Sequence, residues 1–181
     1  KIESRLVTTA GTCAVMGTAS TMACITEALG MALPGTAAIP ATHADRLRAS
    51  EASGAQAVVL ASGDKDNPLV PNRIITPKSV ENALRVLLAI GGSTNAIIHL
   101  TAVAGRLGIP IPLSQLNALS DETPVLIDLK PTGEHYMEDL FKAGGLGVVL
   151  RELKHLLNLD CVTVTGQTLR ERLEVEPEYV D

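Results

Sequence analysis

The sequence predicts an α/β fold in which helices dominate: a helix-rich segment of a three-layer domain with a few short, mostly parallel strands. Amphipathic runs of helical length recur along the chain, and short apolar runs that suit buried strands lie between them. Apolar residues make up 46% of the 181 residues and aromatic residues only 2%, so the core must be built from Ala, Leu, Val and Ile. This length fits a single domain over residues 1–181, large enough to bury a core.

The first half of the chain predicts four helices separated by glycine and proline breaks. Ser79 is the expected N-cap of the third helix, with Asn82 at the position where a full capping box has Glu or Gln. The segment 63–78, which carries three prolines, is expected to be a loop. The expected helices cover about 18–33, 41–62, 79–90 and, capped by Ser93 or Thr94, a stretch that ends at 105–108.

The second half predicts shorter elements. The run PVLIDL at 124–129 is the best candidate for a buried strand, and 161–164 is a second, shorter one. A glycine pair, Gly144-Gly145, separates two expected helices. The expected helices of this half cover 114–119, 137–142, 146–157 and 168–173.

Composition and charge exclude several classes of function. A net charge of −5 gives no electrostatic footprint for nucleic acid, and the scarcity of aromatics argues against base stacking. No apolar run approaches the length of a membrane span, and the N-terminus resembles neither a signal peptide nor a transit peptide. Three cysteines without close spacing favour a reducing compartment, so we expect a cytoplasmic protein. Because the chain starts without Met, we expect a piece of a longer or processed chain.

Cys13 stands among glycines and hydroxyls in GTCAVMGTASTM, residues 11–22. A free cysteine is most often a small buried apolar residue, and that interpretation stays open here. Alternatively, a thiolate just before a helix N-terminus is stabilised by backbone N–H groups and the helix dipole, and can serve as a nucleophile or a metal ligand. A nucleophilic role would need a nearby base, for which His43 is the nearest candidate in the sequence.

Two glycine-rich corners are further candidates. In GGSTN, residues 91–95, Ser93, Thr94 and Asn95 open a helix after a Gly-Gly break, which suits the binding of an anionic or polar substrate. A plain corner between two helices, with Gly as C-cap and Ser or Thr as N-cap, explains the same residues. AGGLG, residues 143–147, is a similar break, and glycine density alone is weak support for a site.

The remaining metal-ligand residue types form no ligand pattern in the sequence. Cys24 and Cys161 lie in apolar surroundings and are expected to belong to the core. His99, between Ile98 and Leu100, is expected in the core or at a corner. His135, beside acidic residues, suits a solvated turn better than a metal site.

Taken together and in order, the motifs resemble the dihydroxy-acid dehydratase and phosphogluconate dehydratase family of iron–sulfur lyases. The resemblance covers essentially the whole chain. It rests on GTCAVMGTASTM (11–22) with EALGMALPGTAAIPA (27–41), on ENALRVLLAIGGSTNAIIHL (81–100), on YMEDLFKAGGLGVVLREL (136–153) and on VTVTGQTLRERL (162–173).

The resemblance implies an enzyme that dehydrates 2,3-dihydroxy carboxylic acids to 2-keto acids with an iron–sulfur cluster and Mg²⁺. It places Cys13 in the family's cysteine motif as one of three cluster ligands, and it favours a 2Fe-2S over a 4Fe-4S cluster. The other two cysteines, the Mg²⁺ ligands and the serine base have no match in this sequence. The chain would then be the middle part of the N-terminal α/β domain of a larger homo-oligomeric enzyme.

The resemblance leaves two substrate classes. GRLGIPIPL (105–113) is more similar to the sugar-acid dehydratases, whereas HYMED (135–139) is more similar to the branched-chain biosynthetic enzyme. We favour a sugar acid on this comparison. A folded remnant or structural module that holds no cluster and has no activity is the non-enzymatic alternative.

Overall fold

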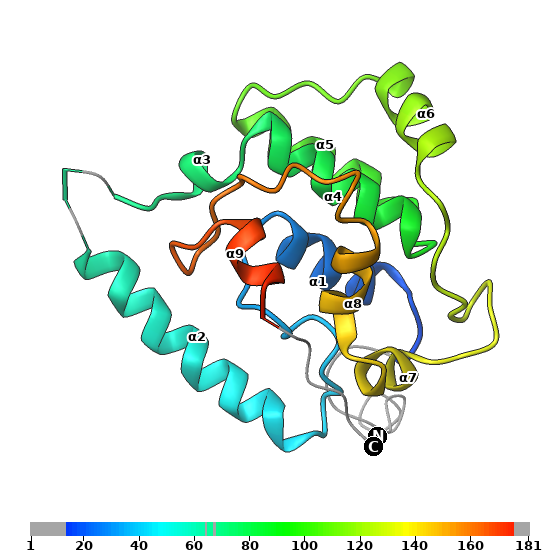
Figure 1. Ribbon diagram of the computed structural model, residues 1–181, viewed down its shortest axis with the longest axis horizontal. Helices are drawn as coiled ribbons and strands as arrows, with labels where there is room; N and C mark the ends of the chain where they lie inside the picture. The colour runs from blue at the N-terminus through cyan, green and yellow to red at the C-terminus, as the bar shows by residue number, and fades with distance from the viewer. Residues whose placement is uncertain (1–13, 64, 67, 176–181) are drawn as a thin grey trace, which may run out of the picture.

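A computed structural model describes residues 14–63, 65–66 and 68–175, and shows them as a helical assembly (Figure 1). Over these residues the chain forms nine α-helices and no β-strand longer than an isolated bridge. The helices are α1 (Thr18–Ala28), α2 (Ala44–Ser62), α3 (Pro71–Ile74), α4 (Pro77–Ala89), α5 (Asn95–Arg106), α6 (Leu113–Glu122), α7 (Met137–Lys142), α8 (Gly145–Glu152) and α9 (Leu169–Leu173).

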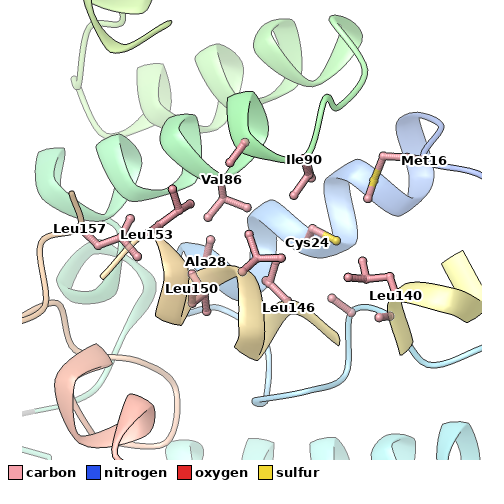
Figure 2. Packing of buried hydrophobic residues seen from close by; sticks show 14 of the residues in the cluster. Met16, Cys24, Ala28, Val86, Ile90, Leu140, Leu146, Leu150, Leu153 and Leu157 are labelled. Atoms are coloured by element: carbon pink, nitrogen blue, oxygen red, sulfur yellow. The ribbon is translucent and has the colours of Figure 1, made fainter. Parts of the chain in front are cut away.

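Helices α1 and α4 pack against each other at the centre and contribute to both apolar clusters of the core. On one side, Cys24 and Val86 join residues of α7, α8 and α9, as Figure 2 shows for part of this cluster. On the other side, Ile25 and Leu84 join residues of α5 and α6. Small and branched aliphatic side chains fill both clusters, as the composition predicts. The helices named above also confirm the predicted dominance of helices.

Helix α1 ends at Ala28, five residues earlier than expected, because of Gly30. This residue has a positive φ of 83°, which favours glycine, and its N–H donates to the carbonyl of Glu27 at 3.0 Å. A Cβ at Gly30 would lie 3.1 Å from the Cα of Thr163 and from the carbonyl oxygen of Val162. The helix therefore stops where the backbone must pass close to the segment before α9.

Helix α4 begins at Pro77, so the prediction of Ser79 as its N-cap is wrong. Thr76 caps the helix: its hydroxyl accepts from the N–H of Ser79 at 3.3 Å, and the Ser79 hydroxyl accepts from the N–H of Thr76 at 2.8 Å. Pro77 at the first helical position is compatible with this start, because the first helical N–H has no partner inside the helix. Ser79 thus takes the third position of the capping box rather than its first.

The other helix predictions differ mainly at their ends. Helix α2 confirms the expected second helix, and α7 has the predicted bounds 137–142. Helix α6 is longer than expected at 113–122, and α8 is shorter, ending at Glu152. The short helix α3 lies inside the segment 63–78 that was expected to be a loop.

The two predicted strands do not form among the described residues, so the three-layer arrangement with parallel strands is not confirmed. Residues 124–129 have no neighbouring strand: the N–H of Leu126 donates to the carbonyl of Ala89 at 2.8 Å, and Val125 is 71% exposed. Leu129 and Val162 form only isolated bridges, with His135 and Thr168. A short apolar run does not make a strand unless a partner backbone lies beside it.

Helix α2 lies at the edge of the molecule (Figure 1) and has no buried residue. Its side chains bond to two other segments: the amide of Gln56 donates to the carbonyl of Val164 at 2.6 Å, and Arg46 donates to the carbonyl of Thr36 at 3.3 Å. Among the helices that the structure describes, none is both long and apolar enough to cross a membrane.

Candidate functional site

The GGSTN corner lies against the start of α1, so residues 72 to 77 positions apart in the sequence meet. The hydroxyls of Thr18 and Ser93 are 2.9 Å apart, and the amide nitrogen of Asn95 donates to the Thr18 hydroxyl at 3.2 Å. The N–H of Ser93 donates to the hydroxyl of Thr21 at 3.0 Å. We call these four residues, Thr18, Thr21, Ser93 and Asn95, the hydroxyl–amide cluster.

Gly92 allows this close approach because it has no side chain. A Cβ at this position would lie 2.6 Å from Cγ2 of Thr21 and 2.8 Å from Cδ1 of Leu87, distances at which a neighbour must move. The glycine therefore lets the corner rest directly on α1. A side chain at Gly92 would therefore interfere with the hydroxyl–amide cluster.

The structure separates the three substrate-binding candidates of the corner. Ser93 is half-buried and Asn95 is exposed, and both belong to the hydroxyl–amide cluster. Thr94 is the N-cap of α5 and is exposed, but its side chain makes no capping hydrogen bond. Ser93 is the residue whose hydroxyl accepts from the helix start, through the N–H of Asn95 at 3.3 Å.

Cys13 lies outside the described residues, but the backbone that follows it is held firmly. The carbonyl of Ala14 accepts from the N–H of Met137 at 2.8 Å, at the start of α7. The N–H of Met16 donates to the carbonyl of Lys130 at 2.8 Å, and the Met16 side chain is buried in the first apolar cluster. The motif that follows Cys13 thus leads directly into the hydroxyl–amide cluster at Thr18.

The other two cysteines have the surroundings of core residues rather than of ligands. Cys24 lies on α1 and is fully buried, and burial raises the pKa of its thiol to about 12. Cys161 is only partly buried, and burial again raises its pKa. Because a ligand must be a thiolate, neither environment favours metal binding. The expectation of a core position is confirmed for Cys24 and holds only in part for Cys161.

The histidines form no metal site in the described part of the chain. His99 is exposed within α5, so the expectation that it lies in the core or at a corner is wrong. His135 is exposed as predicted, with its Nδ1 4.0 Å from a carboxylate oxygen of Asp139. His43 caps α2 by accepting from the N–H of Asp45 at 3.2 Å. No group of three His, Cys, Asp or Glu side chains suited to a metal ion occurs among these residues.

A buried ion pair between Glu27 of α1 and Arg172 of α9 was not predicted from the sequence. The Glu27 carboxylate is fully buried and accepts from the N–H groups of Gly35 at 2.8 Å and Ala37 at 3.0 Å, and from Nη2 of Arg172 at 3.3 Å. Burial raises the pKa of Glu27, although these donors act in the opposite direction. The sequence signal for this pair is Glu27 itself, a charged residue in the mostly apolar stretch ACITEALG (23–30).

The ion pair lies in the wall of a cavity of about 690 Å³ that also includes the AGGLG corner. Burial lowers the pKa of Arg172, while Glu27 opposes this effect. The glycines of the corner leave that part of the wall without side chains. The cavity is also lined by Asp45, Arg48, Arg151 and three glycines, Gly144, Gly145 and Gly147.

Comparison with known proteins places this arrangement of motifs in a family. The family model described as the dihydroxy-acid/6-phosphogluconate dehydratase N-terminal region matches residues 1–172, almost the whole chain. The chain therefore belongs to this family, as its motifs predict.

The chain is also similar to curated relatives named dihydroxy-acid dehydratase. That of Acetivibrio thermocellus is 45% identical over 166 residues, which cover 91% of this chain and 29% of the relative. That of Methanococcoides burtonii is 47% identical over 165 residues, with the same shares, 91% and 29%. That of Caldanaerobacter subterraneus subsp. tengcongensis is 43% identical over 175 residues, 96% of this chain and 31% of the relative. The chain thus spans about three tenths of the length of these relatives.

Proposed function

We propose that the longer protein containing this chain is a hydro-lyase that converts a 2,3-dihydroxy carboxylic acid into a 2-keto acid. In this reaction the C–H bond at C2 and the C–O bond at C3 break, water leaves, and the resulting enol tautomerises to the ketone. The observation that carries the proposal is the match of residues 1–172 to one dehydratase family. The name of the relatives, dihydroxy-acid dehydratase, is consistent with it.

The proposal assigns Cys13 as one thiolate ligand of an iron–sulfur cluster, of the 2Fe-2S rather than the 4Fe-4S type, in an enzyme that also uses Mg²⁺. The described residues do not fit either group, because they contain no cluster of three ligands and the Cys24 thiol is neutral. We therefore assign the remaining ligands to residues outside the described part. Thiolates are the ligands that iron–sulfur clusters require, which is why Cys13 is the candidate in this sequence.

The GGSTN corner, whose Ser93 and Asn95 contact Thr18 just after Cys13, is the part of the chain that we assign to substrate binding. Hydroxyl and amide side chains both donate and accept hydrogen bonds, which matches a substrate with two hydroxyls and a carboxylate. Asn95 and its neighbour Thr94 are exposed, whereas Ser93 is half-buried. We assign Asn95 and Thr94 to direct contact with the substrate and Ser93 to holding Asn95 in place.

Substitution of these residues in the longer enzyme tests the proposal. Asn95→Ala and Thr94→Val are expected to lower kcat/KM for dehydration about threefold to tenfold each, the effect of losing one neutral hydrogen bond. Asn117→Ala, on the exposed side of α6, is the matched control and should leave kcat/KM unchanged. If Asn95→Ala and Thr94→Val both keep the same kcat/KM as Asn117→Ala, the corner does not bind the substrate.

The substrate class and the setting of the enzyme are part of the same proposal. The relatives' name supports the dihydroxy acid of the biosynthetic enzyme, whereas the segment 105–113 favours a sugar acid. An assay of 2-keto acid formation with one substrate of each class decides between them. We further propose a cytoplasmic homo-oligomer that acts on this small molecule and binds neither nucleic acid nor membrane.

A further inference from the structure

The cavity beside α8 and α9 has a wall that carries three arginines and two carboxylates. Two of the arginines are neutralised: Arg172 by Glu27 at 3.3 Å, and Arg48 by Asp45, to which it donates. The third, Arg151, contacts no carboxylate of a described residue, and its Nη1 donates to the carbonyl of Gly147 at 3.4 Å. Among the described residues, this wall therefore carries one more arginine than carboxylates.

Arg172 is the unusual group in this wall. Its side chain is only 5% exposed, yet two of its nitrogens, Nε and Nη1, have no hydrogen-bond partner among the described residues. A guanidinium presents five N–H donors, and burying donors without an acceptor is costly. Buried polar groups in folded proteins are nearly always paired, so these nitrogens indicate an acceptor that the described residues do not supply.

The AGGLG corner adds donors of a second kind. Helix α8 begins at Gly145, and the first N–H groups of a helix have no partner within it. Gly144, Gly145 and Gly147 all line the cavity, so these three residues place no side chain of their own over the positive end of the α8 dipole. Backbone donors and arginines together form the combination that binds carboxylates and phosphates in proteins.

We infer that this cavity binds the carboxylate or phosphate group of a small molecule, held by Arg151, Arg172 and the start of α8. The volume of about 690 Å³ is that of a typical small-molecule site. An anion there would lie beside the buried Arg172 guanidinium and balance the charge of Arg151. This inference does not depend on the proposed dehydratase activity, since it rests on the cavity, its charges and the unpartnered nitrogens.

Calorimetric titration of the purified chain with inorganic phosphate, and separately with acetate, tests the inference. Saturable binding of either probe, with a rise in the unfolding temperature, is expected. The probe that binds more tightly identifies the group as phosphate or carboxylate. Arg151→Gln removes the unbalanced cation and is expected to weaken binding about tenfold, the effect of losing a charge-assisted hydrogen bond.

Two further variants separate binding from folding. Arg172→Lys keeps a cation beside Glu27 but loses the planar set of N–H donors, so it is expected to weaken binding by a similar factor. Arg170→Gln is the matched control, because Arg170 lies on the same helix but pairs with Asp160 at 3.0 Å, outside the cavity wall. It should bind like the unmodified chain. Absence of binding by both probes, or equal loss in Arg151→Gln and Arg170→Gln, would overturn the inference.

Discussion

Replacing Glu27 by alanine removes the only carboxylate that contacts Arg172 among the described residues, and the structure predicts a large loss of stability. The change leaves the buried guanidinium without a counter-ion, which typically costs about 3–5 kcal/mol. It also takes the acceptor from the N–H groups of Gly35 and Ala37, which are bonded to Glu27 at 2.8 and 3.0 Å. We therefore expect the free energy of unfolding to fall by at least about 3 kcal/mol, a large part of the total for a domain of this size.

Urea unfolding followed by far-ultraviolet circular dichroism measures this loss. Glu51→Ala, on the exposed helix α2, is the matched control and should change stability by no more than about 0.5 kcal/mol. The double variant Glu27→Ala with Arg172→Met removes the unpaired charge as well, so it should lose less than Glu27→Ala alone. If Glu27→Ala unfolds at the same urea concentration as the unmodified chain, Glu27 does not anchor the 35–37 turn and the reasoning fails.

Two further predictions concern the packing of α1. Gly92→Ala pushes a methyl group against Thr21 and Leu87 and should cost about 1–3 kcal/mol of unfolding free energy, whereas Gly105→Ala, with open space around its Cβ, should be neutral or stabilising. Equal stability of the two variants in urea would contradict the close approach of the corner to α1. Burial raises the pKa of Cys24 from 9.0 to about 12, so above pH 9 the unfolded state loses the thiol proton first and stability falls. Cys24→Ala should therefore lose stability less steeply between pH 9 and 11, by up to about 1.4 kcal/mol per pH unit, and identical slopes would refute the buried thiol.

The sequence predicted those parts of the structure that depend on local patterns. Helix α2 and helix α7 follow from runs of good helix formers and from the breaks beside them. The start of α4 was misplaced because Ser79 looks like an N-cap, and only the bond between Thr76 and Ser79 shows which of the two hydroxyl residues begins the helix. A capping box pairs two polar side chains, and residue type alone does not show that Thr76 rather than Ser79 is the N-cap.

The strand predictions failed for a different reason. The run 124–129 is apolar enough for a buried strand, but a strand needs a partner backbone, and Leu126 bonds to the end of α4 instead. In the candidate site too, local patterns predict individual residues but not the contacts between distant segments. The motifs predict Ser93 and Asn95 as candidates, but their contact with Thr18 and the pairing of Glu27 with Arg172 join residues 75 to 145 positions apart, which no local pattern reveals.

The role of Cys13 in the longer enzyme is the claim that one measurement tests most directly. After reconstitution with iron and sulfide, the unmodified enzyme should show the visible absorption of an iron–sulfur cluster and form a 2-keto acid from a 2,3-dihydroxy acid. Cys13→Ala should lose the absorption and the activity, whereas Cys24→Ala, which removes the buried neutral thiol, should keep the absorption. The isolated 181-residue chain should show neither signal. Full cluster absorption and turnover in Cys13→Ala would contradict the proposal.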